Sequence, residues 1–158
     1  TLLLPFRQVH QMAAGVLAVA LSVRGYAGSF AERRGHLRND SHAIDAINIR
    51  TAMWIHDHTP ADAVVGVNDA GAIRYFGERH TVDLVGINNQ DLVFGRASVR
   101  SELERCNWLA IFPTVFPEDG PFIRENFKLE AVIKIPPREY TVCDCPGQSL
   151  VAIFSRNP

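Results

Sequence analysis

The sequence lacks a surplus of charge of either sign. Its 16 Lys and Arg residues and 17 Asp and Glu residues leave a formal net charge of −1. A dedicated nucleic-acid-binding protein usually carries a basic surplus, because phosphate contacts supply most of its affinity. We therefore expect no nucleic acid as a partner. Repeats and low-complexity tracts are absent too, and 158 residues, 47% of them hydrophobic, are enough for one domain with a real core.

Cysteine is scarce, and the motifs that depend on it are missing. The chain has 3 cysteines and no C-x-x-C, so neither a disulfide framework nor a zinc knuckle is indicated. Cys143 and Cys145 form a C-x-C, and a bond between two such close neighbours along one strand is not expected. Cys106 would meet one of them only if their strands adjoin. Small buried thiols are the favoured interpretation.

Common catalytic and metal-binding motifs are also missing. The sequence has no G-x-S-x-G elbow and no H-E-x-x-H. The pair His56 and His58 lies near a predicted helix end, but residues two apart do not share a helical face and chelate poorly. We expect solvated or capping histidines, no metal and no catalytic residue in this chain.

The turn between the two apolar runs of VVGVNDAGAIRYFGERHTVDLVGINN only partly fits a phosphate-binding loop. Gly66 and Gly71 cover two of the three glycines of a dinucleotide fingerprint. They also have the spacing of a P-loop, but Ala72 and Ile73 stand where Lys and Ser or Thr are needed. Asp69 would repel phosphate and is better explained as a helix N-cap. No nucleotide cofactor is therefore expected.

The N-terminal apolar run is short. Met12–Leu21 is purely apolar, whereas a membrane-spanning helix needs about 20 residues. A signal-peptide layout is absent, and the chain opens at Thr1 without Met, so we expect a piece of a longer protein. Val9–Val23 fits a core helix or a shortened last membrane helix, and both interpretations stay open here. The polar segment Arg24–Asp40 is interrupted by glycines and predicts a linker or a membrane-edge segment near lipid head groups.

Helical and strand patterns alternate in the first part of the chain, and strands dominate later. The pattern predicts an α/β fold with a Rossmann-like open sheet, parallel at first with antiparallel C-terminal edge strands, preceded by an apolar N-terminal helix. Expected helices are one that starts at Asp40 or Ser41 and stops before Pro60, one from Asp69 to Phe76 ended by Gly77, and short ones at Ser98–Arg105 and Pro121–Phe127. Expected strands are Ala63–Val67, Thr81–Val85, Trp108–Phe112, Glu130–Ile135, Tyr140–Cys143 and Leu150–Phe154, with Trp54 and Trp108 in the core.

Two aspartates follow neighbouring predicted strands. Asp69 and Asp83 would lie at the carboxyl ends of parallel strands, where open α/β sheets bind ligands. Two carboxylates there can act as acid and base, but a helix cap and a strand-end hydrogen bond are the favoured interpretation. Asp69, Asp83, Asn88 and Asn89 are the best candidates for contacting a polar ligand such as a sugar.

The run Ile49–Asn89 also carries an ordered series of short motifs. Its pieces are Trp54, Thr59–Ala63, Asp69–Ile73, Tyr75–Phe76 and Val82–Gly86. In this order they resemble a segment that follows the last membrane helix in many bacterial polytopic glycosyltransferases of the GT-C type, related to the dolichyl-phosphate-mannose protein mannosyltransferase and aminoarabinose transferase families. The match covers about a quarter of the chain and contains no catalytic motif.

The resemblance implies that residues 1–40 are the end of a membrane portion with a basic linker, and that residues 41–158 are a soluble α/β domain. It places that domain on the periplasmic side of the bacterial inner membrane, as a non-catalytic part of a transferase that uses a polyprenyl-phosphate-linked sugar. The catalytic acid of such families lies in an early extracytoplasmic loop, outside this sequence. The implied partners are the membrane portion of the same polypeptide and a lipid-linked sugar or its acceptor. We further expect Gly71 to allow close helix–sheet packing, and Tyr75 and Phe76 to be buried.

Two alternatives remain at this point. One is a free-standing Rossmann-like domain that binds a nucleotide or another small molecule, suggested by the strand–turn–helix–strand outline. The other is a membrane-tethered binding module without a transferase attached.

Overall fold

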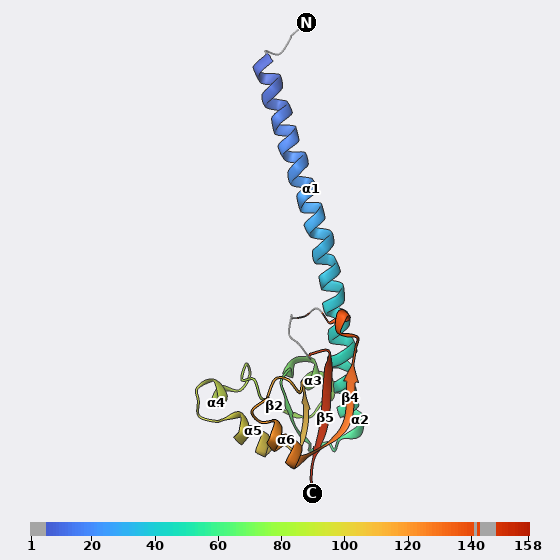
Figure 1. Cartoon of the computed structure of the whole chain (residues 1–158), viewed down its shortest axis with the longest axis vertical. Helices are drawn as coiled ribbons and strands as arrows, with labels where there is room; N and C mark the ends of the chain where they lie inside the picture. The colour runs from blue at the N-terminus through green and yellow to red at the C-terminus, as the bar shows by residue number, and fades with distance from the viewer. Residues whose placement is uncertain (1–5, 141, 143–147) are drawn as a thin grey trace. The chain divides into compact units, whose positions relative to one another are not determined.

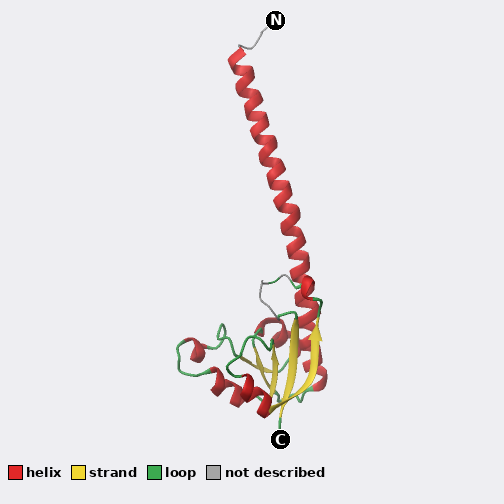
Figure 2. Cartoon of the chain, in the orientation of Figure 1, coloured by secondary structure: helices red, strands yellow, loops and turns green. Residues whose placement is uncertain are grey.

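A computed structural model of the chain describes residues 6–140, 142 and 148–158. The chain divides into two compact units, Thr1–Arg38 and Asn39–Pro158. The first unit contains most of helix α1 (Phe6–Ala43), and the second is an α/β domain with a five-stranded sheet (Figures 1 and 2).

Helix α1 is continuous where a linker was predicted. It runs through Gly25, Gly28 and Gly35 without a break, so the predicted helix start at Asp40 or Ser41 is wrong. The segment Arg24–Asp40, predicted as a linker or a membrane-edge segment, is helical. The reason is that an isolated glycine costs a helix only about 1 kcal/mol relative to alanine. Proline would break the helix, but the sequence has none between Pro5 and Pro60.

The same helical path continues into the α/β domain. A π-helical segment, η1 (Ile44–Ile49), leads into α2 (Arg50–His58). Ile47, Thr51 and Ile55 are fully or almost fully buried, so one face of this helical path packs into the domain. The helix ends before Pro60, as predicted, because the residue before a proline is pushed towards extended geometry; Thr59 has φ −116° and ψ 151°.

The sheet confirms the predicted fold class. Its strands are β1 (Val64–Val67), β2 (His80–Asp83), β3 (Trp108–Ile111), β4 (Phe127–Lys134) and β5 (Leu150–Arg156). The spatial order is β2-β1-β3-β5-β4. Strand β1 pairs in parallel with β2 and β3, while β5 pairs antiparallel with β3 and β4. The domain is therefore an open α/β sheet, parallel at first, with an antiparallel edge.

Each face of the sheet is covered by its own set of helices. Val65 and Val67 point to one face and join a core with Ile47, Ile55 and Ile73 from the helices η1, α2 and α3. The intervening positions point to the other face, where the core is formed by residues of β2, β3, α5, α6 and β4, including Val82, Leu103, Leu109, Ile111, Ile123 and Phe127. This alternation is the period-two pattern expected of strands that are buried on both faces.

In the part of the chain that the structure describes, four short helices and one 3-10 turn connect the strands. They are α3 (Ala70–Gly77), α4 (Gln90–Val93), α5 (Val99–Arg105), α6 (Gly120–Asn126) and η2 (Pro137–Glu139). Ser98 caps α5 through its side chain, which accepts from Ser101 N. The sequence did not predict α4, because four residues carry too little periodicity. Tyr140 and Val142 are not in a strand, and the other residues of the predicted strand Tyr140–Cys143 lie outside the described part.

Helix α3 corrects two predictions about the Asp69–Gly77 segment, the burial of Tyr75 and Phe76 and the close packing at Gly71. Tyr75 is 77% exposed and Phe76 is also exposed, so their predicted burial is wrong. A Cβ on Gly71 would meet nothing within 4 Å, so it mediates no close packing. A Cβ on Gly77 would lie 3.5 Å from the Ala52 carbonyl oxygen of α2, which is an ordinary van der Waals contact. The helix ends at Gly77, as predicted, and Glu78 follows it as the C-cap with φ 51°.

Arg79 ties the ends of two helices together. Its guanidinium donates to the His56 carbonyl at 2.6 Å and to the Thr59 carbonyl at 2.9 Å, both at the end of α2. It also donates to Gly77 O, at the end of α3, at 3.4 Å. The last carbonyls of a helix have no partner within the helix, so one cationic side chain satisfies several of them and stabilises this corner of the domain.

Cys106 is a buried free thiol at the end of α5, as predicted for it. Burial, together with the nearby Glu102 carboxylate, raises the pKa of the Cys106 thiol from 9.0 to about 12. Thiolates react with disulfide reagents and thiols do not, so the folded protein protects this residue. Cys143 and Cys145 lie outside the described residues.

A variant in which Cys143 and Cys145 are serine isolates the behaviour of Cys106. We expect no reaction with Ellman's reagent in buffer at neutral pH and one reactive thiol in denaturant. The pKa is raised on folding, so this group stabilises the protein fully below about pH 9, and that contribution is lost as the pH rises towards 12. Urea unfolding of this variant and of its Cys106→Ala derivative measures the difference. Rapid labelling of the folded protein would contradict the burial of Cys106.

Candidate functional site

The carboxyl edge of the parallel strands is the place where an open α/β sheet would bind a ligand. Strand β1 has β2 on one side and β3 on the other, so the direction of the connections reverses at β1. Asn68 and Asp69 follow β1, and Phe112 follows β3. The crevice between these two strand ends is therefore the switch point of the sheet.

A side chain bridges this switch point. Asn68 Oδ1 accepts a hydrogen bond from the backbone N–H of Phe112 at 2.7 Å, which joins the ends of β1 and β3. Phe112 itself belongs to the buried core. Dinucleotide-binding sheets keep the corresponding backbone open for a pyrophosphate. In this domain, the Asn68 side chain connects the two sides of the crevice, which argues against the interpretation as a nucleotide-binding site.

Asp69 occupies the N-cap position of α3 but does not cap it through its side chain. Its φ of −129° and ψ of 90° are those of an N-cap, yet its carboxylate makes no bond to the helix N–H groups. Instead, Asp69 Oδ2 accepts from the side-chain amide of Asn48, a buried residue of η1. The predicted side-chain cap is therefore wrong, although the negative charge of this carboxylate still interacts favourably with the positive end of the helix dipole. The same charge disfavours phosphate.

Asp83 builds the loop that follows β2. Its Oδ1 accepts from Val85 N at 2.9 Å and from Gly86 N at 3.1 Å, and its Oδ2 accepts from Asn88 N at 2.7 Å. Asp83 is buried, and charge-assisted hydrogen bonds of this kind are stronger than neutral ones. Both carboxylate oxygens are engaged in a strand-end network, as the favoured sequence interpretation expected.

Asn88 and Asn89 have different environments. The Asn89 side chain accepts from Asp91 N at 3.2 Å, which caps α4, and donates to Asp83 O at 3.3 Å. Asn88 is exposed, and its backbone N–H is held by Asp83. Asn89 thus has a structural role, whereas the amide of Asn88 faces solvent.

Three of the four candidate residues line one polar depression. Its volume is about 290 Å³, and its lining includes Asp83, Asn88, Asn89, Gln90, Glu102 and Arg105. Asp69 is not part of it, although Asp69 lies two residues after β1 and Asp83 is the last residue of the neighbouring strand β2, where it is paired with Val67. The structure therefore separates the two aspartates into different networks, and ligand binding by the four residues stays a prediction.

Among the lining residues that sequence reasoning missed is the charged pair Glu102 and Arg105. Glu102 is buried on α5, and both of its carboxylate oxygens accept from Arg105 Nη1, at 3.1 and 3.0 Å. A carboxylate three residues before an arginine is a common pair on helix surfaces, so the sequence did not indicate that Glu102 is buried. The depression combines amides with paired charges, which suits a polar, uncharged ligand better than a phosphate.

The two histidines near the end of α2 contact different partners. His58 Nδ1 lies 2.8 Å from Trp54 O, in the helix-end position predicted for it, and its ring stacks on Trp54. His56 Nδ1 lies 3.8 Å from Glu78 Oε2. Within residues 6–140, 142 and 148–158, no group of three or more His, Cys, Asp or Glu side chains could hold a metal ion.

The geometry defines the class of this protein as an open-sheet α/β domain. The side chain of Asn68 bridges its switch point, and the carboxylate of Asp83 supports the loop after β2. Residues 36–154 match the family described as a domain of unknown function, DUF8728, and the chain belongs to that family. No curated protein matches the chain, and no solved structure does.

Proposed function

We propose that the chain is the non-catalytic, extracytoplasmic domain of a bacterial membrane glycosyltransferase that uses a polyprenyl-phosphate-linked sugar donor. The ordered motifs between Ile49 and Asn89, which resemble the GT-C segment described above, support the proposal. In the structure these motifs form α2, β1, α3 and β2, the framework of one side of the sheet. The domain then assists acceptor binding or closure of an active site that lies in the membrane portion.

The single structural observation that carries the proposal is the exposed apolar surface of α1. Among the described residues, one helical stretch is long and apolar enough to cross a membrane by length and composition, with a mean hydropathy of 1.3 in an 18-residue window that is not buried at all. Met12, Val16, Leu17, Val19 and Leu21 are exposed around the helix. A helix that is apolar all round requires a membrane or a protein interior around it.

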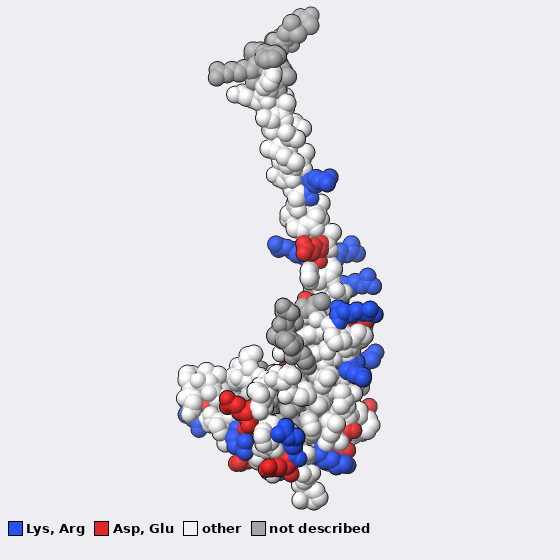
Figure 3. All heavy atoms as spheres, viewed as in Figure 1, with Lys and Arg blue, Asp and Glu red and all other residues white. Residues whose placement is uncertain are grey.

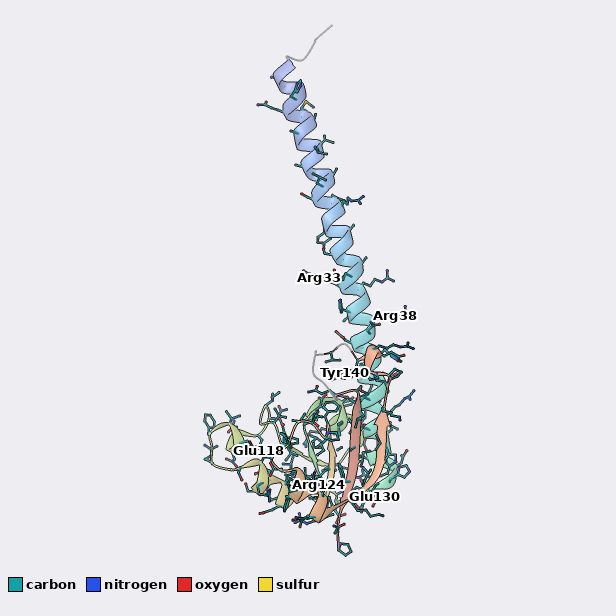
Figure 4. All side chains as sticks on the ribbon, in the orientation of Figure 1. Arg33, Arg38, Glu118, Arg124, Glu130 and Tyr140 are labelled. Carbon is teal, nitrogen blue, oxygen red and sulfur yellow. The ribbon has the colours of Figure 1, made fainter. Side chains whose placement is uncertain are left out.

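The length of this apolar stretch fits a span that uses its flanking arginines. No Asp, Glu, Lys or Arg lies between Arg7 and Arg24, and the segment contains one histidine, His10. That stretch spans roughly 24 Å at about 1.5 Å per residue, against about 30 Å for a hydrocarbon core. Long basic side chains close such a gap by extending to the head groups. Figure 3 shows basic residues on α1 after its uncharged part, and Figure 4 shows Arg33 and Arg38 projecting outward from the helix.

The arginines also make the proposal testable through topology. Arg24, Arg33, Arg34 and Arg38 follow the apolar stretch, and an excess of basic residues marks the cytoplasmic side of a membrane helix. If α1 were the sole span, the α/β domain would therefore face the cytoplasm. The glycosyltransferase proposal requires further membrane helices before Thr1 that fix the opposite orientation.

Fusions to the intact protein that contains this chain test the proposal. Alkaline phosphatase is active only in the periplasm and green fluorescent protein is fluorescent mainly in the cytoplasm, so each is joined after Pro158. We expect an active phosphatase fusion and a dark fluorescent-protein fusion. The opposite pattern, or an intact protein with α1 as its single membrane helix, would contradict the proposal.

An assay of sugar transfer separates a binding domain from a catalytic one. Membranes that contain the intact protein are supplied with a radiolabelled polyprenyl-phosphate sugar. Substitution of the acid in the first extracytoplasmic loop is expected to abolish transfer. Asp69→Asn is expected to change the rate by less than about threefold, because groups that act in proton transfer usually contribute about a hundredfold or more. A loss of that size in Asp69→Asn would place the chemistry in this domain instead.

A further inference from the structure

The connection between β2 and α5, residues 84–98, exposes an unusual number of large apolar side chains. Ile87 is 83% exposed, Phe94 is 66%, Val93 is 63% and Val85 is 50%. Single exposed apolar residues are normal, but several in one short segment mark a contact surface. Figure 1 shows that this segment, with α4, stands out from the sheet. We call residues 84–98 the apolar loop.

Many backbone N–H groups of the apolar loop have partners within the loop or on Asp83. The Asp83 carboxylate accepts from the N–H groups of Val85, Gly86 and Asn88. Further along, the N–H groups of residues 93–97 donate to carbonyls within the loop, from Asn89 to Leu92. Backbone groups that are already paired can leave water at little cost, whereas unpaired ones cannot. These paired N–H groups would therefore cost little to move from water into a medium of low polarity.

The charges of the apolar loop cancel within the loop. Arg96 Nε donates to Asp91 Oδ1 at 2.8 Å, and the loop contains no other acidic or basic residue. The Arg96 guanidinium also lies over the Phe94 ring, 5.1 Å from its centroid. An aromatic ring beside a long basic side chain suits the boundary between acyl chains and head groups, where the arginine reaches phosphate.

The chain joins the α/β domain at the same edge of the sheet that carries the apolar loop. Asn48, shortly after the start of this domain, bonds to Asp69 at the carboxyl end of β1. The neighbouring strand β2 ends at Asp83, which is paired with Val67 of β1. The opposite, amino edge is where α2 ends and Asp62 precedes β1. The polypeptide that leads to the proposed membrane segment is thus attached at the carboxyl edge.

We infer that the apolar loop inserts Ile87, Val93 and Phe94 into the head-group boundary of a lipid bilayer and so holds the carboxyl edge of the sheet against the membrane. The inference rests on the proposed function, because it needs α1 to lie in the membrane. It adds a second attachment point that fixes the orientation of the domain. The switch-point residues and the polar depression then lie on the membrane-facing side, where a lipid-linked sugar is accessible.

Fluorescent labels test the insertion in the 158-residue chain. Cys143 and Cys145 are changed to serine, Cys106 is protected by burial, and Ile87→Cys or Phe94→Cys carries an environment-sensitive nitrobenzoxadiazole label. Asp62→Cys, exposed at the amino edge, is the matched control, and Leu17→Cys reports on α1. The labelled proteins are reconstituted in vesicles of phosphatidylcholine and phosphatidylglycerol.

We expect the labels at positions 87 and 94 to gain at least about twofold in emission, because they leave water for the head-group boundary. They should be quenched by lipid-attached nitroxides and protected from iodide in solution, while the label at position 62 shows the reverse. Equal iodide quenching at 62, 87 and 94 would overturn the inference. Protection from both quenchers would also overturn it, because a second protein copy and not lipid would then cover the loop.

The label at Leu17 keeps the two proposals distinguishable. If it is quenched by lipid nitroxides while the labels at 87 and 94 remain in water, the loop inference fails and the membrane segment stands. If the label at Leu17 also remains in water, the membrane-anchored function fails and the loop inference fails with it.

Discussion

Replacement of Asp83 by Ala is expected to lower the free energy of unfolding of the α/β domain by about 3 kcal/mol, because three backbone N–H groups lose their charged acceptor together. The distances of 2.7–3.1 Å and the burial of Asp83 place these bonds in the strong range. Trp54 and Trp108 both lie in this domain, so urea unfolding followed by tryptophan fluorescence measures the change without a signal from α1.

Two matched variants sharpen the Asp83 experiment. Asp83→Asn keeps one acceptor oxygen but turns an N–H₂ group towards a donor, so we expect an intermediate loss. Asp91→Ala removes the exposed ion pair with Arg96 and is expected to cost less than about 1 kcal/mol. Hydrogen exchange at Val85, Gly86 and Asn88 should accelerate in the Asp83 variants. If Asp83→Ala were as stable as Asp91→Ala, the loop would not depend on this carboxylate.

The Asp83 network also explains which part of the candidate site the sequence could predict. An aspartate at the end of an apolar run, followed by Gly86 and two asparagines, is a recognisable strand–loop boundary. Whether the carboxylate faces a ligand or the backbone depends on the path of the loop, in which Gly86 has φ +101°. That path is set by contacts with α4, a helix too short to predict.

Contacts between distant residues account for most of what the sequence could not supply. Asn48 is 21 residues from Asp69, and Asn68 is 44 residues from Phe112. Neither asparagine belongs to a motif, and each position is ordinary for a helix or a strand end. Their partners are determined by the order of the strands in the sheet. The polar bridge across the switch point therefore became visible only in the three-dimensional structure.

The fold was more predictable than the site because its elements are defined locally. Strands β1, β3 and β5 were predicted nearly at their observed bounds, since each is a continuous apolar run bounded by turn residues. Several of the errors concern glycines. Gly25, Gly28 and Gly35 do not interrupt α1, and Gly71 packs against nothing within 4 Å, whereas Gly66 and Gly77 lie where neighbouring atoms are close. A glycine's role depends on what lies opposite it, and the sequence does not contain that information.

Gly66 shows this dependence most clearly and leads to the second large prediction. It lies in β1, and a Cβ at this position would be 2.9 Å from Cys106 Sγ and 2.9 Å from Leu109 Cδ2. Both neighbours are buried in the core on that face, so they cannot swing into solvent. We expect Gly66→Ala to destabilise the domain by about 1–3 kcal/mol through overpacking. Gly71→Ala is the control, and in an exposed helix position it is expected to be neutral or slightly stabilising.

A double-mutant cycle assigns the cause of the Gly66→Ala effect. Cys106→Ala removes the sulfur that a Cβ on Gly66 would approach, so the cost of Gly66→Ala should be smaller in the Cys106→Ala background by at least about 0.5 kcal/mol. Leu109 still presses on the new methyl group, so the rescue is expected to be partial. Unfolding in urea of the four proteins of the cycle gives this coupling. Full additivity would show that the new methyl group is accommodated without displacing the sulfur. The close approach of β1 to α5 would then not be the reason for glycine at this position.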